Sequence, residues 1–433
     1  MFRGFVSAFR TPDLRKKLLL TLGILAVYRL GVAIPTPGVS YANVQFCASN
    51  NTGANSALGI LNLFAGGALL HLSIFALGIM PYITASIIVQ LLRVLIPRFE
   101  TLYREGQEGQ AKLTQYTRYI TVGFAALQSA SYITLARNGQ FFPGCARPII
   151  PDESWQTISL MVLTMTAGTV FVMWLGERIT ERGVGNGMSL LIFTSIAAAF
   201  PQNISAVFHS SNGPVNTFLL ALLLFVVIAV VVFVEQSQRR IPVQYAKRVV
   251  GRRTLGGSST YIPLKINMAG VIPVIFASSL LTLPTIIGQF AGDNPPSWIT
   301  WMNDHIAKTS QPLHMLLYIL LIIFFAYFYT AITFNPDQVA DDMKKYGGFI
   351  PGIRPGKPTA DFLSFVLSRI TAAGSIYLAL VALAPMLAFV AMGVSTNIPF
   401  GGTSILILVG VGLDTVKRIQ SQLEQRHYEG FLK

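Results

Sequence analysis

The sequence predicts an all-α polytopic membrane protein. Of its 433 residues, 52% are hydrophobic and only 12% are Asp, Glu, Lys or Arg, whereas a soluble domain carries about 25% charged residues. The mean hydropathy is +0.57. Apolar segments recur along the whole chain, and about 20 apolar residues are enough to cross a bilayer as a helix.

Ten apolar segments are candidates for membrane spans. The clearest lie at residues 158–174, 215–234, 268–290, 313–334 and 365–392, weaker ones at 18–34, 119–136, 188–200 and 403–413, and one long run at 58–92. The basic N-terminal tail leads into residues 18–34 without a small-residue cleavage site. We therefore interpret that segment as the first span and not as a cleaved signal peptide.

The run 58–92 is too long for one span and too short for two. If it crosses once, 27 of the 32 Lys and Arg residues fall on one side and three on the other, with Arg29 and Arg369 within or at the ends of spans. If it crossed twice, every later loop would change sides and this asymmetry would be lost. The positive side is cytoplasmic, so both termini are predicted to be cytoplasmic. The first half of the run is predicted to enter from outside without crossing.

Ten spans divide into two groups of five, and the second group then starts from the opposite face. This topology alone predicts two inverted five-helix halves, residues 18–208 and 209–420, flanked by cytoplasmic tails at 1–17 and 421–433. The second half carries two long basic loops, predicted to be cytoplasmic, at 235–265 and 335–361. The first loop has a β-branched run that favours a hairpin, and the Gly and Pro residues of the second favour a shaped turn.

The loops favour a large polyanionic or acidic partner at the cytoplasmic face, such as a ribosome or an acidic motor protein. The alternative is that their charges only fix topology and attract anionic lipid. Charged residues avoid the centres of the apolar segments, where ion-coupled transporters usually keep one. Phosphate-loop and zinc-helix motifs are missing, so we predict no enzyme, no catalytic residue, no metal and no cofactor. Cys47 and Cys145 fall in predicted outward loops, and the sequence leaves open a disulfide or two free thiols.

A series of motifs runs in order along nearly the whole chain: IPTPG (34–38), NLFAGGAL, SIFALGIMPYITASIIVQLL (73–92), QYTRY (115–119), MWLGERITERGVGNG (173–187), RRIPVQYAKR (239–248), PLKINMAGVIPVIFASS (263–279), FNPDQVADDMKK (334–345), GIRPG (352–356) and FGGTSILILVGVGLD (400–414). With these motifs, the chain resembles the SecY family of protein-translocation channels. The resemblance implies two five-helix halves around a central pore, hinged between spans five and six. Unfolded chains would pass through the centre, and signal sequences and membrane helices would leave sideways into the lipid.

The resemblance also implies roles for individual residues. A re-entrant half-helix at 58–68 would be the plug that seals the pore, with Leu61, Asn62, Phe64, Gly66 and Gly67. A ring of isoleucines would line the pore: Ile79, Ile83, Ile192, Ile275 and Ile407. Gln90 and Asn267 would form a weak polar contact at the lateral gate. The second span would run from about residue 72 to 92.

By the same resemblance, a basic surface would dock the motor ATPase SecA or the ribosome: Arg239, Arg240, Lys247, Arg248, Arg252, Arg253, Lys344, Lys345, Arg354 and Lys357. Further expected partners are the small subunits SecE and SecG, signal sequences, unfolded preproteins and lipids, but not DNA. The expected location is the bacterial plasma (inner) membrane. Two alternatives are a small-solute transporter, disfavoured by the missing midplane charges and the basic loops, and an insertase without a pore, disfavoured by the half-span.

Overall fold

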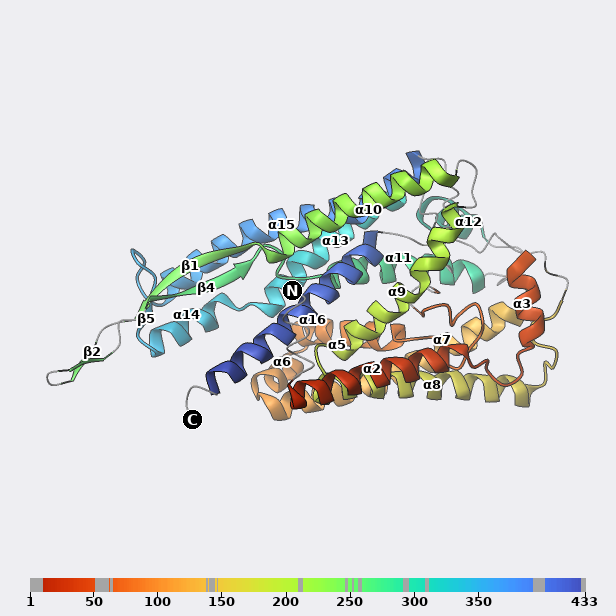
Figure 1. The fold of residues 1–433 in the computed structure, drawn as a ribbon, viewed down its shortest axis with the longest axis horizontal. Helices are drawn as coiled ribbons and strands as arrows, with labels where there is room; N and C mark the ends of the chain where they lie inside the picture. Colours follow the sequence, from red (N-terminus) through yellow and green to blue (C-terminus); the bar gives the residue numbers. More distant parts are fainter. Residues whose placement is uncertain are drawn as a thin grey trace.

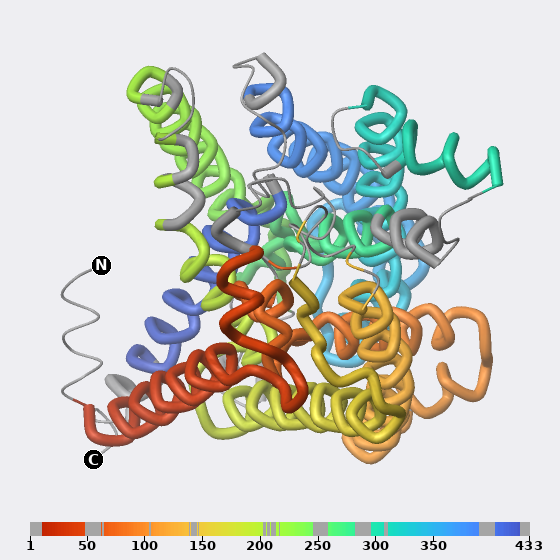
Figure 2. The backbone as a smooth tube through the Cα atoms, turned by 90° about the vertical axis from the view of Figure 1, so that its right-hand side faces the viewer, coloured from red at the N-terminus to blue at the C-terminus, as the bar shows by residue number. Residues whose placement is uncertain are grey.

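The computed structural model describes residues 11–50, 62, 65–137, 139, 145, 147–208, 213–245, 248–250, 253–255, 259–290, 296–307, 311–391 and 402–429. Most helices run along one long axis (Figure 1). Viewed from the end, helices α2, α7 and α8 lie on one side and α10, α13 and α15 on the other, with α9, α11 and α16 between them (Figure 2). The site discussed below lies among these central helices.

The first half of the chain holds α2 (Pro12–Ala33), α3 (Tyr41–Asn50), α5 (Met80–Leu95), α6 (Pro97–Arg104), α7 (Gln107–Arg137), α8 (Trp155–Arg182) and α9 (Gly187–Phe208). The second half holds α10 (Gly213–Gln236), α11 (Ile272–Phe290), α12 (Ser297–Met302), the π-turn η1 (Asn303–Ala307), α13 (Pro312–Thr333), α14 (Pro336–Lys345), α15 (Lys357–Ala391) and α16 (Gly402–Glu429). Each of the ten predicted apolar segments contains a helix.

By length and composition, four helices among the described residues could cross a membrane: Trp155–Arg182, Thr217–Gln236, Pro312–Lys345 and Lys357–Ala388. A fifth candidate is the pair Met80–Leu95 and Pro97–Tyr103, which is bent by 106°. Ile96 is extended at this bend, as expected of a residue that precedes proline. The structure thus has the apolar helices of a polytopic membrane protein, and the count of ten spans stays a prediction.

The second apolar segment differs from its prediction. We expected a span from about residue 72, but α5 begins at Met80 and residues 65–79 form turns interrupted by one isolated bridge residue. Gly66, Gly67 and Gly78 all have positive φ, and Leu72 is also positive at 44°. Three left-handed glycines break the helical repeat, and α5 starts with a proline in its first turn, a position that proline favours.

Within the part of the chain that the structure describes, the strands are confined to the two basic loops predicted to be cytoplasmic, so the predicted all-α class describes the membrane part. Strands β1 (Gln238–Tyr245) and β4 (Ser259–Lys265) pair antiparallel, which confirms the predicted hairpin, and β2 (Arg248–Val250) pairs with β3 (Arg253–Leu255) at its tip. β5 (Gly348–Phe349), from the second basic loop, adds to the edge of β1. The sequence predicted a turn there and not a strand, because a two-residue strand has no periodicity to detect.

The outer end of α8 is fixed by a local hydrogen-bond network. Ser154 is the N-cap, and its hydroxyl accepts a hydrogen bond from the Thr157 amide. The Asp152 carboxylate accepts hydrogen bonds from the Thr157 hydroxyl at 2.9 Å and the Ser154 amide at 3.1 Å. These bonds favour the charged form and hold the pKa of Asp152 below its ordinary value. The loop before α8 is therefore tied to the start of the helix.

Apolar side chains cover the outside of the helices as well as the core. On α10, Leu220 and Leu224 are buried whereas Phe218 and Phe225 are 69% and 72% exposed. Large aromatic and aliphatic side chains exposed along one helix are unfavourable in water but favourable in lipid. The exposed apolar belt agrees with a membrane environment.

Candidate functional site

The five isoleucines predicted to form a ring belong to one packed apolar cluster. They come from distant parts of the chain: Ile79 and Ile83 at the start of α5, Ile192 on α9, Ile275 on α11 and Ile407 on α16. The side chains of all but Ile83 are at most 6% exposed, and Ile83 packs against the others. The cluster joins the two halves of the chain. Ile275 and Ile407 come from the second half, and Ile79, Ile83 and Ile192 come from the first.

The turns at residues 65–79 pack into the same cluster, through buried Ala65, Ala68, Leu69 and Leu72. They are held by hydrogen bonds from the Gly67 amide to the Asn62 carbonyl at 2.9 Å and from the Leu70 amide to Asn62 Oδ1 at 3.1 Å. This part of the predicted plug is a set of turns and not a helix. Residues 58–61, 63 and 64 lie outside the described residues, and these include the predicted plug residues Leu61 and Phe64.

Arg29 lies at the site, although no role was predicted for it. It lies on α2, and its Nη1 donates a hydrogen bond to the Gly66 carbonyl at 3.1 Å. Beside it, the Tyr28 hydroxyl and the Ser195 hydroxyl on α9 are 2.7 Å apart and buried. A Cβ atom on Gly66 would lie 3.2 Å from the Ser195 Cα, and Gly66 has φ +67°. The turn therefore fits closely against α2 and α9. A charged side chain within an apolar segment was the available signal, since such residues usually have a specific partner.

The structure does not join Gln90 and Asn267 by a hydrogen bond. Gln90 Nε2 donates to Ser86 within α5 at 3.4 Å, and Asn267 Nδ2 donates to Glu235 Oε1 at 2.6 Å and to the Gly270 carbonyl at 3.1 Å. The expected polar contact between Gln90 and Asn267 is therefore wrong for this conformation. Instead α5 meets the second half through an apolar contact, with Ile87 packed against the core of that half.

The two basic loops, both predicted to be cytoplasmic, form one surface, because β5 of the second loop pairs with β1 of the first. Exposed side chains of this surface are Arg239, Arg240, Lys344, Lys345, Arg354 and Lys357. Arg248 and Arg253 lie on β2 and β3, and Lys247 and Arg252 lie outside the described residues. The sheet thus brings together cations that are separated by about a hundred residues in sequence. It packs against α14 and α15, and only the β2–β3 tip projects beyond the helices (Figure 1).

A disulfide joins Cys47 and Cys145, which lie in loops predicted to face outward, with Cα atoms 5.7 Å apart. The sequence left this pairing open, and the structure decides for the bond. It joins α3 to the segment between α7 and α8, where Asn43 Nδ2 also donates to the Pro148 carbonyl at 2.8 Å. The Ser40 amide donates to the Ile149 carbonyl at 3.0 Å. Helix α3, which precedes the predicted plug in the chain, is therefore fixed to the outer surface.

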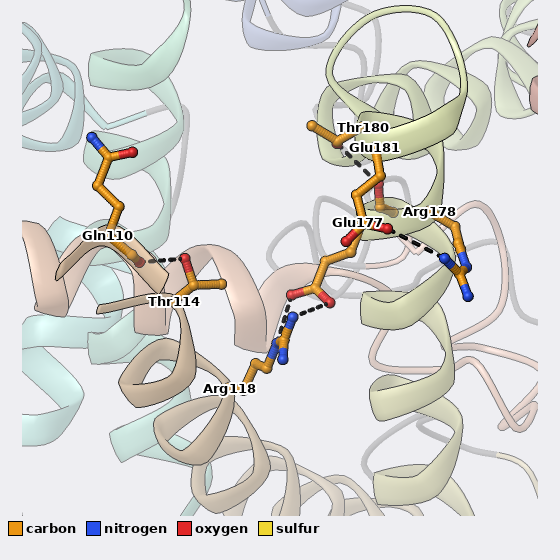
Figure 3. Close-up of polar contacts among 8 residues, drawn as sticks. Gln110, Thr114, Arg118, Glu177, Arg178, Thr180 and Glu181 are labelled. Carbon is orange, nitrogen blue, oxygen red and sulfur yellow. Dashed lines mark hydrogen bonds and ion pairs between the residues drawn. The ribbon is translucent and has the colours of Figure 1, made fainter. Parts of the chain in front are cut away.

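A bidentate ion pair joins two of the quoted motifs. Arg118 of α7 donates from Nε and Nη2 to the two carboxylate oxygens of Glu177 on α8, each at 2.9 Å (Figure 3). The side chain of Glu177 is only 17% exposed. By contrast, Arg178 turns to Glu181 on its own helix at 3.3 Å. The first pair fixes α7 against α8, and opposite charges at the cytoplasmic ends of neighbouring spans were the signal that sequence reasoning missed.

The site is therefore an apolar cluster between two groups of helices, with a turn segment packed against it, and the molecule carries a separate basic surface on its sheet and loops. Among the described residues, no group of three or more His, Cys, Asp or Glu side chains could hold a metal ion. This arrangement defines a helical membrane protein whose two halves meet at a core of hydrocarbon side chains.

Comparisons with known proteins agree with the predicted resemblance to the SecY family. The family model described as SecY matches residues 73–416. A protein translocase subunit SecY from Streptomyces coelicolor is 59% identical over 438 residues, covering 100% of both chains, and that of Mycobacterium tuberculosis strain H37Rv is 56% identical over 442 residues, again covering 100% of both chains. The chain belongs to the SecY family.

Solved structures share the fold at low sequence identity. One described as a protein conducting channel has a TM-score of 0.62 at 18% identity, covering 94% of this chain and 91% of that one. Sec61 in a canine ribosome–channel complex from the endoplasmic reticulum has a TM-score of 0.56 at 15% identity, with the same coverage.

Proposed function

We propose that this chain is the central subunit of a protein-conducting channel. It passes unfolded secretory proteins across the membrane and membrane-protein helices sideways into the lipid. Family membership supports this function, and the observation that carries it is the gathering of Ile79, Ile83, Ile192, Ile275 and Ile407 from both halves into one closed apolar cluster. The chain acts as a gated pore and not as a catalyst.

The isoleucine ring suits a substrate of arbitrary sequence. Aliphatic side chains close around a peptide without requiring hydrogen bonds to it, and an apolar constriction limits ion leakage by excluding water. The segment 58–68 acts as the plug on the outer side of the ring. This role is supported by the packing of residues 65–72 into the ring cluster and by the hydrogen bond from Arg29 to the Gly66 carbonyl.

The energy for transport comes from partners at the cytoplasmic surface. We propose that the basic surface, including Arg239, Arg240, Arg354 and Lys357, docks SecA or the ribosome. The exposure of these cations supports this, as do the salt-sensitive contacts that clustered cations make with RNA phosphates. One structural relative is a channel in complex with a ribosome. SecE and SecG complete the complex in the bacterial plasma membrane, and both termini of this chain are cytoplasmic.

Protease protection of a signal-bearing preprotein tests the proposal. The preprotein is added to proteoliposomes that hold this chain, SecE, SecG, SecA and ATP. We expect protected preprotein only with ATP and an intact signal sequence, and at least a tenfold loss of protection with Arg354→Glu. Lys308→Glu, a charge reversal in a predicted outer loop, serves as the matched control and should retain full protection. Wild-type vesicles without protection, in which the protein is folded and correctly oriented, would refute the proposed function.

A further inference from the structure

Glu235 lies where four parts of the second half meet. It is in the last turn of α10, two residues before the chain continues into the hairpin strand β1. Its carboxylate accepts the 2.6 Å hydrogen bond from Asn267 Nδ2, just ahead of α11. Its main-chain carbonyl accepts a hydrogen bond from Lys417 Nζ of α16 at 3.4 Å. Glu235 therefore links the end of α10 to the segment just before α11 and to the middle of α16, next to the base of the hairpin.

Both donor hydrogens of the Asn267 side-chain amide have hydrogen-bond partners in this arrangement. Asn267 is buried, with 4% of the residue exposed. Its Nδ2 donates both to Glu235 Oε1 and to the Gly270 carbonyl, the latter at 3.1 Å. A side-chain amide has two donor hydrogens, so both have partners. Gly270, with φ +62°, forms the turn that leads into α11. The position of the first turn of α11 is thus set by the bond to Glu235.

The same pair crosses the base of the hairpin. The strand ladder begins with Gln238 opposite Lys265, and the Ile266 amide donates to the Ser237 carbonyl at 3.2 Å below it. Asn267 directly follows Ile266, and Glu235 lies two residues before Ser237. A tilt of the hairpin therefore acts directly on the bond between them, because no flexible linker separates the ladder from the pair.

The pair has room to separate. It lines a cavity of about 210 Å³, together with Ser189 of the first half and with Lys265, Asp414 and Lys417. Since walls of the cavity come from α9 and from α11 and α16, a movement of one half against the other changes its shape. A buried, fully packed pair could not break without a large rearrangement, whereas the Glu235 carboxylate shares this cavity with the cations Lys265 and Lys417 and can turn to them.

We propose that Glu235 is a positioning residue that holds α11 in the closed state through Asn267 and releases it when a docked partner moves the hairpin. This inference rests on the proposed function, and it assigns the coupling between the docking surface and the gate to one hydrogen bond. Hydrogen bonds to charged groups are among the stronger ones in proteins. Loss of the bond favours the released position of α11 and relaxes the requirement for a functional signal sequence.

The test measures selectivity, which a merely structural role would not move. In the proteoliposome assay, the ratio of protection for a preprotein with a defective signal to that for the intact preprotein is compared among variants. We expect Glu235→Ala and Asn267→Leu each to raise this ratio about tenfold, which corresponds to about 1.4 kcal/mol. The double variant should raise it no further, because both changes remove the same bond. Glu235→Gln retains an acceptor oxygen and should stay within threefold of wild type.

Two further variants are controls. The first tests whether the effect depends on a change of side-chain shape, and the second tests whether it follows from loss of any acid in the cavity. Asn267→Asp places a carboxylate against Glu235 at nearly unchanged shape and should also raise the ratio about tenfold. Asp414→Asn removes an acid from the same cavity that pairs with Arg418 and not with Asn267, and should leave the ratio unchanged. SecA affinity for the vesicles should be the same for all variants within twofold.

The inference is overturned if Glu235→Ala has wild-type selectivity, if the effects of Glu235→Ala and Asn267→Leu multiply to about a hundredfold, or if the Glu235 variants weaken SecA docking. These outcomes are separate from failure of the proposed function. In that case wild-type vesicles would export no intact preprotein at all, whereas here wild-type export proceeds and only the dependence on Glu235 is missing.

Discussion

Breaking the disulfide between Cys47 and Cys145 is expected to release α3 from the outer surface. The bond closes a chain separation of 98 residues, for which chain entropy gives a stabilisation of about 4.7 kcal/mol. Helices α5 and α7 lie within this loop and remain in the membrane after reduction, so the chain that is actually freed is shorter. A loop of about 15 residues gives about 3 kcal/mol. Local opening of α3 should therefore become more frequent by a factor of about 10² to 10³.

Hydrogen exchange of the α3 backbone amides measures this local opening. Cys47→Ser and Cys145→Ser should each raise the exchange rate by the same factor, and the double variant should add nothing, since either change removes the bond. Asn43→Ala keeps the disulfide and loses only the hydrogen bond to the Pro148 carbonyl, so its effect should not exceed about tenfold. Less than a fivefold increase in Cys145→Ser, with a free thiol verified at Cys47 by maleimide labelling, would refute the reasoning.

Three further outcomes are expected. Gly168→Ala should lower the free energy of unfolding in detergent by about 1–3 kcal/mol, because its Cβ would meet the main-chain carbonyl of the turn before α5. Gly123→Ala, with open space at the Cβ, should instead raise it by about 1 kcal/mol; equal effects would contradict this account. Because the pKa of Asp152 is depressed, its contribution is present above its unfolded pKa of about 3.9 and is lost as the pH falls through the lower folded value. Amide exchange in the first turn of α8 should therefore rise in acid for wild type but show no such step in Asp152→Asn. A double-mutant cycle of Arg118→Gln and Glu177→Gln should give a coupling of about 1 kcal/mol in thermal unfolding, and a coupling of zero would remove the pair from the packing of α7 on α8.

The membrane character, the charge asymmetry and the cytoplasmic hairpin could be predicted from the sequence because each depends on neighbouring residues. Apolar runs report burial or lipid contact locally, and Lys and Arg in loops report orientation without knowledge of the fold. The β-branched run between α10 and α11 predicted the hairpin in the same way. The helices nevertheless extend beyond the apolar segments, as α16 does from Gly402 to Glu429, because a helix continues into polar surroundings where hydropathy gives no signal.

The inward faces of the helices could not be predicted from hydropathy. Lipid is as apolar as a protein core, so lipid-facing and core-facing positions have the same composition. On α10, Leu220 is buried and Phe218 is exposed, although both are large hydrophobic residues. The family resemblance singled out Ile79, Ile192, Ile275 and Ile407 among many isoleucines, and only the packing of the helices brings them together.

The sequence by itself determined that this chain is a polytopic membrane protein with a strong asymmetry of basic charge, and it predicted a half-span after the first helix. The tertiary structure decided the pairings across long separations: Cys47 with Cys145, Arg118 with Glu177, and Asn267 with Glu235 in place of Gln90. It also decided that residues 65–79, where the second span was expected to begin, form turns. Composition and periodicity act along the chain, whereas a bond between distant residues depends on the depth and rotation of each helix, which are fixed only when the helices pack.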